Sequence, residues 1–212
     1  MKKILIVILS LCLISFAPAC VSLSRDKEKV SELRDKVFIA VSEEMKVTLI
    51  TGVREEPFSP DGESGNKREF SVLTITPTQS TETALYTFQI KLGESVFEGE
   101  MNKHPLKKTW SYELDERIEQ ECVVTVTTDN FAQSFSLKSV IKEDFISPDE
   151  AYRIARKELS NPDGEIFVRL LENPLTPSAE GYYWYVAFVQ SNYRIKAVLI
   201  HPQSKEVVAR RD

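Results

Sequence analysis

Short runs of alternating apolar and polar residues fill the middle of the chain. A period of two places the apolar side chains on one face of an extended strand, so each run predicts a half-buried strand. About seven strands in about a hundred residues are typical of an antiparallel β-sandwich, so we expect a mainly β fold with a sandwich domain over residues 45–141. The predicted strands cover residues 46–51, 70–76, 84–92, 95–101, 109–114, 121–128 and 132–140.

The pattern changes after residue 141. Ser147-Pro148-Asp149-Glu150 is a capping box with proline at the first helical position, and the apolar residues after it recur at helical spacing. One helix followed by an antiparallel sheet predicts a small α+β domain over residues 142–212. Its predicted strands cover residues 165–171, 182–190 and 193–201, with a short return at 207–208.

Both parts resemble known families. The strand pattern of residues 45–141 resembles an immunoglobulin-like sandwich, without the paired cysteines of antibody-type domains. In the C-terminal part the order of residues 146–155, an aromatic strand at 183–186 and residues 196–208 resembles the PepSY domain. Ser204-Lys205 stand where that family usually has a Thr-Gly pair. PepSY domains are small helix-plus-sheet modules of protease propeptides and exported bacterial proteins. The resemblance therefore implies interaction with a partner, such as an exported peptidase, or its inhibition.

The strand predicted at residues 182–190 is apolar on both faces. Tyr183 and Tyr185 point to one side and Trp184 points to the other, because side chains alternate along a strand. One face must cover the predicted helix. The other face either packs against the sandwich domain or stays exposed, and tyrosine suits a partner-binding surface because its apolar ring has a polar tip. Tyr183 and Tyr185 are therefore candidate partner-binding residues.

Residues 1–19 have the order of a secretory signal, with a basic start, an apolar run over residues 4–17 and small residues before Cys20. A run of 14 residues is shorter than the roughly 20 that a helix needs to span a bilayer, so we expect cleavage. The segment resembles a bacterial lipoprotein signal, although Ala17 and Pro18 depart from the usual box. The resemblance implies export and attachment to the outer surface of the cell membrane through lipid on Cys20. The alternative is an ordinary secreted protein.

Residues 20–44 join the lipid attachment point to the first predicted domain. Val30, Leu33 and Val37 recur at helical spacing, which predicts a short amphipathic helix. The alternative is a solvated linker followed by a first strand at residues 36–41, because that stretch is rich in β-branched and aromatic residues. The pattern leaves both open.

The net charge of the chain argues against some classes of partner. Removing Lys2 and Lys3 with the signal leaves 25 of the 27 basic residues against 32 acidic ones, a formal charge of −7. An acidic chain without a basic stripe argues against nucleic acid and against polybasic binding to anionic lipid.

Cys12 leaves with the signal, so we expect Cys122 to be a small buried residue on a strand. A disulfide between Cys122 and Cys20 is the alternative.

The sequence carries no recognised catalytic or cofactor motif. Neither His104 nor His201 has a second His or Cys at metal-ligand spacing, and neither a serine nucleophile elbow nor a glycine-rich phosphate loop occurs. Adjacent acids at element boundaries are expected to be solvated, as in Glu43-Glu44, Glu55-Glu56, Asp115-Glu116 and Glu143-Asp144. We therefore expect a non-enzymatic interaction or peptidase-modulating module without metal or cofactor. The alternative is a binder of a small ligand, peptide or wall fragment at the junction of the two domains.

Overall fold

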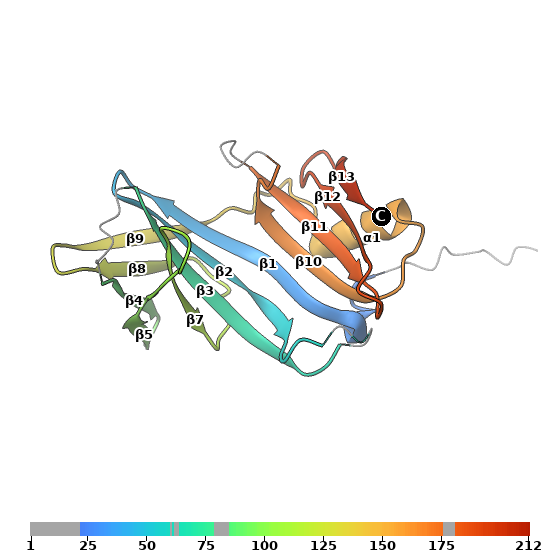
Figure 1. The fold of residues 1–212 in the computed structure, drawn as a ribbon. Helices are drawn as coiled ribbons and strands as arrows, with labels where there is room; N and C mark the ends of the chain where they lie inside the picture. Colours follow the sequence, from blue (N-terminus) through green and yellow to red (C-terminus); the bar gives the residue numbers. More distant parts are fainter. Residues whose placement is uncertain (1–21, 60, 62–63, 79–84, 176–180) are drawn as a thin grey trace, which may run out of the picture.

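The computed structural model describes residues 22–59, 61, 64–78, 85–175 and 181–212 (Figure 1). Within them the chain is mainly β and largely antiparallel, which confirms the predicted fold class at this level. The helices are the 3-10 helix η2 (Lys27–Lys29) and α1 (Pro148–Glu158). The strands are β1 (Val30–Val41), β2 (Met45–Glu55), β3 (Lys67–Pro77), β4 (Thr87–Leu92), β5 (Ser95–Glu100), β6 (Asn102–Lys103), β7 (Trp110–Leu114), β8 (Cys122–Thr127), β9 (Ala132–Ser139), β10 (Glu165–Glu172), β11 (Tyr182–Val189), β12 (Ile195–Ile200) and β13 (Val207–Arg211).

Of the two structures expected for residues 20–44, a helix or a linker followed by a strand, the structure shows a strand, β1. Residues 30–41 form a strand, so the amphipathic helix is wrong, and the strand begins well before Lys36. β2 pairs along one edge of β1, while the other edge pairs first with β10 in parallel and then with β9 in antiparallel orientation. Ladder hydrogen bonds on both edges, together with β-branched side chains, favour the strand over the helix that the spacing alone suggests.

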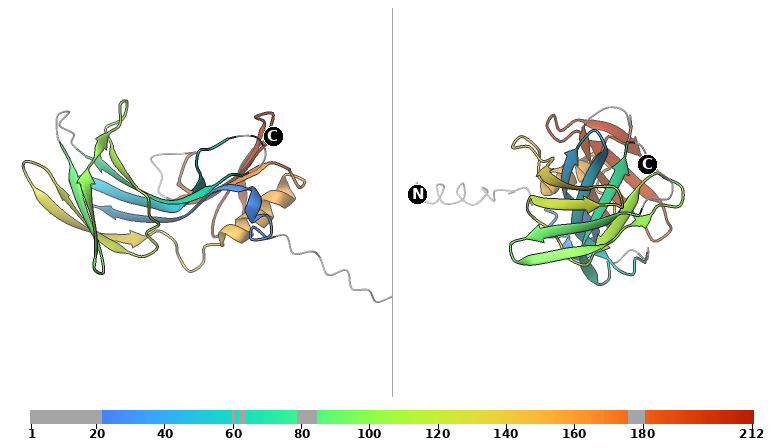
Figure 2. Two further views of the ribbon diagram at one scale, coloured as in Figure 1. Left: turned by 90° about the horizontal axis from the view of Figure 1, so that it is seen from below. Right: turned by 90° about the vertical axis from the view of Figure 1, so that its left-hand side faces the viewer.

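Strands β2–β9 and the second half of β1 enclose the first core. β9 returns to pair with β1 at Phe38 and Ile39. On the other side β5 runs into β6, and the Met101 N–H between them donates to the Tyr86 carbonyl at 2.8 Å. The pairing therefore continues around the core as a nearly closed, barrel-like arrangement, where the sequence suggests two facing sheets (Figure 2). Trp110 is among the largest side chains buried inside.

The second core lies between α1 and one face of β10–β13. Tyr152 and Ala155 from the helix pack in the same cluster as Trp184 from β11. The Ser147 hydroxyl accepts a hydrogen bond from the Glu150 N–H at 3.2 Å, and proline occupies the first turn. This confirms the predicted helix start, because such a cap satisfies a backbone donor that has no partner inside the helix.

β1 connects the two ends of the molecule. Val30 and Val37 belong to the core beside α1, whereas Phe38 belongs to the barrel-like core. All thirteen described strands form one connected sheet, elongated between a barrel-like end and a helix-covered end (Figures 1 and 2). β1 therefore pairs with strands from both sides of residue 142, so the two predicted domains are joined through one sheet and not only through a packed interface.

A β-bulge between Arg34 and Lys36 bends β1 where it passes from one core to the other. Gly52 of β2 lies opposite this bulge. A Cβ on Gly52 would lie 2.0 Å from the Leu33 carbonyl oxygen, so only glycine allows β2 to approach β1 so closely.

The start of the described chain is docked onto α1. The Leu23 N–H donates to the Asp149 carboxylate at 2.7 Å, and the Leu23 side chain is buried in the second core. The Tyr152 hydroxyl donates to Asp26. Residues 22–29 are therefore part of the folded body and are not a solvated linker.

Candidate functional site

Two rows of side chains cross the sheet on the face that α1 does not cover, which we call the open face. Directly paired residues share a face of a sheet, and the register is continuous over seven strands from β13 to β3. The first row is Ala209, Leu199, Tyr185, Arg169, Arg34, Gly52 and Phe70. The second row is Arg211, Ala197, Ala187, Phe167, Glu32, Arg54 and Arg68.

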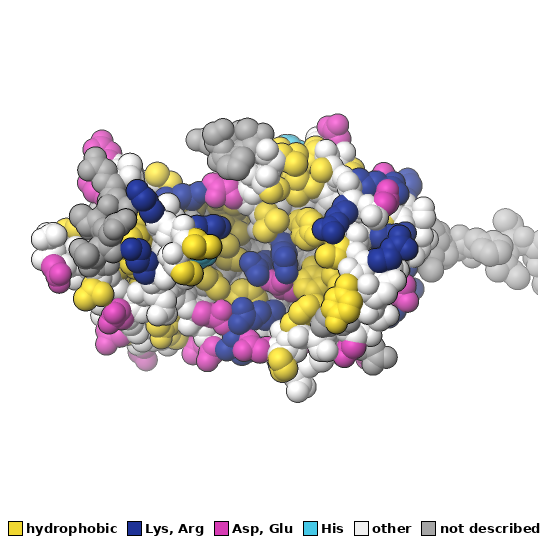
Figure 3. All heavy atoms as spheres, in the orientation of Figure 1, with side chains coloured by type: hydrophobic (Ala, Val, Ile, Leu, Met, Phe, Trp, Pro, Cys, Tyr) yellow, Lys and Arg dark blue, Asp and Glu magenta, His cyan; other side chains and the backbone are white. Residues whose placement is uncertain are grey.

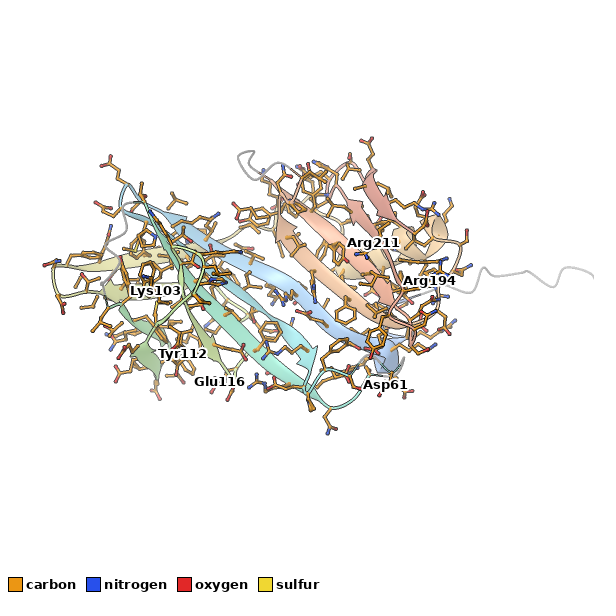
Figure 4. The ribbon with its side chains drawn as sticks, viewed as in Figure 1. Asp61, Lys103, Tyr112, Glu116, Arg194 and Arg211 are labelled. Atoms are coloured by element: carbon orange, nitrogen blue, oxygen red, sulfur yellow. The ribbon has the colours of Figure 1, made fainter. Side chains whose placement is uncertain are left out.

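The open face changes character along these rows. Apolar side chains predominate over β10–β12, and guanidinium groups gather where β10 meets β1 and β2. Figure 3 shows basic side chains over the middle of β1 with hydrophobic side chains beside them. Arg211 lies over the C-terminal sheet in Figure 4, at the far end of the second row. The surface therefore combines an apolar part with a charged part.

A buried carboxylate holds two arginines at the centre of this face. Glu32 is only 4% exposed. One of its oxygens accepts hydrogen bonds from Arg169, whose Nε lies 2.8 Å away, and the other accepts from Arg34. The Arg34 guanidinium lies 5.7 Å from the centre of the Phe70 ring, and that of Arg169 lies 5.1 Å from the Phe167 ring. Ion pairing and cation–π contact thus fix both guanidinium groups.

A second charged group lies further along the second row. Arg54 and Arg68 both pair with Glu56 and Glu113, and Arg68 also pairs with Asp115. The hydrogen bond from Arg54, with the nearby charge of Arg68, lowers the pKa of the Glu56 carboxyl. These arginines already have several carboxylate partners, so this group ties together β2, β3 and β7.

Tyr185 lies on the apolar part of the open face. It lines a shallow groove of about 310 Å³, together with Leu199 and Ala209 and bordered by Arg211. Its cluster, centred on Phe167, is separate from both main cores, so this side of β11 does not pack against the barrel-like core.

Tyr183 lies instead at the junction between the two ends of the molecule. A cavity of about 630 Å³ opens there between the ends of β1 and β9 on one side and β11 and β12 on the other. The Tyr183 ring contacts His201 edge-on, with 5.5 Å between ring centres. Lys46 and Glu172 form an ion pair at the cavity wall. The structure thus assigns the two candidate tyrosines to two different sites.

The junction cavity combines neutral hydrogen-bonding groups with charged ones. Burial, together with the nearby Glu172 charge, raises the pKa of Tyr182 to about 12, so its hydroxyl stays protonated at neutral pH. The Nδ1 atom of His201 accepts a hydrogen bond from the Ser204 N–H at 3.1 Å. Lys142 adds a positive charge to the wall. The cavity can therefore receive a polar ligand with apolar parts.

The residues considered for metal or nucleophilic chemistry lie apart from one another. His104 accepts hydrogen bonds at Nδ1 from Leu106 and Lys107 in the loop before β7. Cys122 is a buried free thiol on β8, and burial raises its pKa to about 11. Within the described ranges, no group of three or more His, Cys, Asp or Glu residues could hold a metal ion.

Glu55 corrects the expectation that the adjacent acids are solvated. Its side chain is only 5% exposed at the end of β2, whereas Glu56 beside it is exposed. The loop after β2 folds back over this point, where the Glu56 N–H donates to the Asn66 carbonyl at 3.0 Å. Glu143 and Asp144 are exposed, as expected.

Sequence reasoning missed the central residues of the open face. Arg169 stands alone among apolar residues of β10, and Glu32 and Arg34 are two residues apart in a segment with two open interpretations. A lone arginine in an apolar strand is a usable signal, because burying it requires a partner. The partner lies far away in sequence, so the signal could not have identified Glu32.

The remaining predictions concern the chain's surroundings. Cys20 lies outside the described residues. None of the described helices is long and apolar enough to cross a bilayer. Comparison of the chain with protein-family models, curated proteins and solved structures finds no match.

Proposed function

We propose that this chain is an exported bacterial protein, held at the outer surface of the cell membrane by lipid on Cys20, and that it acts there as a non-enzymatic interaction module. The partner is an exported or membrane protein such as a peptidase, whose activity the module modulates. The observation that carries the proposal is the open face, where an apolar groove and a pair of oriented arginines lie side by side. Protein interfaces are rich in such aromatic and arginine side chains.

The resemblances suggest a division of labour within this proposal. The PepSY-like order of residues 142–212 supports partner binding by the C-terminal end, which carries Tyr185 and the other residues that line the groove. The immunoglobulin-like pattern of residues 45–141 supports a spacer or adhesion role for the barrel-like end. Because β1 pairs with both, the spacer would fix the orientation of the binding face.

A point variant tests the proposal better than truncation does. Removing residues 142–212 would take β10 from β1 and expose the core around Val30 and Val37, so loss of binding would have no clear meaning. We propose Tyr185→Asp instead, with Tyr193→Asp as the matched control, because Tyr193 is 73% exposed in the turn between β11 and β12 and does not line the groove.

Cross-linking at the native cell surface, followed by mass spectrometry, gives the readout. We expect the intact chain and the Tyr193→Asp variant to capture the same exported protein, and the Tyr185→Asp variant to lose it. A captured peptidase would then be assayed with and without the purified chain. Equal capture by both variants would exclude the open face as the interface. If the protein were recovered from culture medium without lipid on Cys20, only the anchoring part of the proposal would be wrong.

The junction cavity favours a second candidate function, the binding of a small ligand, peptide or wall fragment. Its volume of about 630 Å³ lies within the range of small-molecule sites, and Tyr183, His201 and Lys142 supply polar groups beside apolar side chains of the wall. Thermal-shift measurements with peptides and wall fragments test it. A stabilisation that disappears in Tyr183→Ala and persists in Tyr185→Asp would place a ligand at the junction.

A further inference from the structure

We infer that Arg34 and Arg169 form a carboxylate-binding subsite on the open face, and that its ligand is a polypeptide whose carboxylate lies beside an apolar residue. This inference rests on the proposed function, because it names what the partner presents to that face.

The charge at the subsite is unbalanced. Two guanidinium groups share the single carboxylate of Glu32, and within the described residues no other carboxylate forms an ion pair with either of them. Both oxygens of Glu32 are already occupied, and the two arginines keep about 30% of their side-chain surface exposed. One net positive charge therefore faces the solvent at the centre of the face. A ligand carboxylate would neutralise it.

The two guanidinium groups are held in place before any ligand arrives. Glu32 fixes one edge of each, and the rings of Phe70 and Phe167 support their faces. An arginine held in this way loses little side-chain entropy when it binds, and its planar fork suits the two oxygens of a carboxylate. Arg54 and Arg68 differ, because Glu56 and Glu113 already occupy them.

The apolar groove beside Arg169 favours a polypeptide ligand over a small anion. Arg169 pairs directly with Tyr185 across β10 and β11, and Tyr185 pairs with Leu199 on β12. Neighbouring strands lie about 4.8 Å apart, so the groove begins one strand away from the guanidinium. An extended chain can therefore place an apolar side chain over Tyr185 and Leu199 while its carboxylate reaches Arg169. The carboxylate can be the chain terminus or an acidic side chain.

Matched peptides test the inference on the unmodified protein. The probes are hexapeptides with a fluorescent N-terminus and the sequence Ser-Gly-Ser-Gly-Val-Leu, one ending in a free acid and one in an amide. A third probe is an amide with Glu in place of Val. Fluorescence polarisation with the mature full chain should show the free acid binding at least tenfold more tightly than the plain amide. Tight binding of the Glu amide would identify a side-chain carboxylate as a ligand too, whereas weak binding would restrict the ligand to a chain terminus.

Variants then locate the binding. Arg169→Gln and Arg34→Gln should each abolish the difference between acid and amide, whereas Arg153→Gln, an exposed change on α1, should preserve it. Thermal melts identify any variant that fails to fold, and the acid–amide comparison on the unmodified protein stands without them. Equal affinity for all three probes, the free acid, the plain amide and the Glu amide, overturns the carboxylate subsite. If Tyr185→Asp nevertheless loses its captured partner, the proposed function stands and only the subsite is wrong.

Discussion

The most informative residues in this chain are charged groups in unexpected surroundings. Glu32 is nearly as buried as its apolar neighbours, yet it lies between two arginines that remain partly exposed. A carboxylate is removed from water at a large cost unless charged hydrogen bonds replace its hydration, and here both oxygens accept such bonds. The ion pair with Arg169 crosses from β1 to β10, whereas Arg34 lies on β1 itself, so this one carboxylate links β1 to the strands packed under α1.

Replacing Glu32 by Gln should therefore destabilise the fold. The amide is nearly isosteric but leaves two guanidinium groups without a counter-charge, and we expect a loss of about 2 kcal/mol in the free energy of unfolding. Urea unfolding at pH 7 measures it. Glu206→Gln is the control, because Glu206 is exposed and forms no ion pair among the described residues, and should change stability by less than about 0.5 kcal/mol. Equal effects of the two changes would contradict this role.

Cys122 gives a prediction about alkaline pH. Burial raises the pKa of its thiol to about 11, whereas an unfolded thiol ionises near about 8.5. The folded state holds the proton more tightly, so this contribution to stability is complete below about pH 8.5 and disappears as the pH rises towards 11. We expect on the order of 2 kcal/mol over this range.

The measurement is a series of urea unfolding curves between pH 8 and pH 11. In Cys122→Ala the decline over this interval should be shallower by the same amount, whatever the absolute stability of the variant. A thiol reagent at pH 8 should leave native Cys122 unmodified and label it fully in denaturant, because the buried thiol is neither charged nor accessible. Rapid labelling of the native protein would contradict the assigned burial.

At the scale of elements, local pattern predicted most of the fold. Period-two alternation located the strands between residues 45 and 141, and the capping box located the start of α1, because both signals depend on neighbours in sequence. Signals that depend on distant partners were out of reach. Residues 30–41 form a strand because β2, β9 and β10 pair with it. The apolar and charged parts of the open face lie side by side only because β1 pairs in parallel with β10.

Gly52 tests how strictly β1 and β2 must approach each other at the bulge. A Cβ there would meet the Leu33 carbonyl oxygen at 2.0 Å, and strand backbone cannot move aside without breaking the ladder. We expect Gly52→Ala to cost more than about 3 kcal/mol or to prevent folding, while Thr48→Ala on the same strand should cost less than about 1 kcal/mol. Thermal and urea unfolding compare them. A well-folded Gly52→Ala protein of unchanged stability would show that the bulge can relax.

The whole molecule has a defined orientation relative to its proposed anchor. Only Val21 separates Cys20 from Ser22, and the chain is docked from there onward. The hydroxyl of Ser22 donates to Asp149 at 3.2 Å, and Lys29 pairs with Asp163 at 2.7 Å. A lipid on Cys20 would thus hold the bilayer close to the start of α1. The barrel-like end, where Figure 4 places Lys103, lies at the other end of the molecule and would point away from the membrane.

Fluorescence quenching can measure this orientation. We would label Arg153→Cys on the exposed side of α1, one turn after Asp149, and Leu106→Cys in the barrel-end loop, where Leu106 is 91% exposed. In vesicles whose lipids carry a spin label on the headgroup, the lipidated protein should show strong quenching at position 153 and little at position 106. A Cys20→Ser protein, which cannot be lipidated, should show neither.

A longer tether shows whether α1 lies near the bilayer because the tether is short or because α1 itself binds lipid headgroups. Inserting twenty Gly-Ser residues between Val21 and Ser22 adds a flexible reach of roughly 25 Å, so quenching at position 153 should fall towards the level at position 106. If quenching persisted, α1 itself would bind the lipid headgroups. If both positions were quenched equally without the insertion, the body would lie flat or tumble on its anchor. The open face would then have no fixed direction from which to meet its partner.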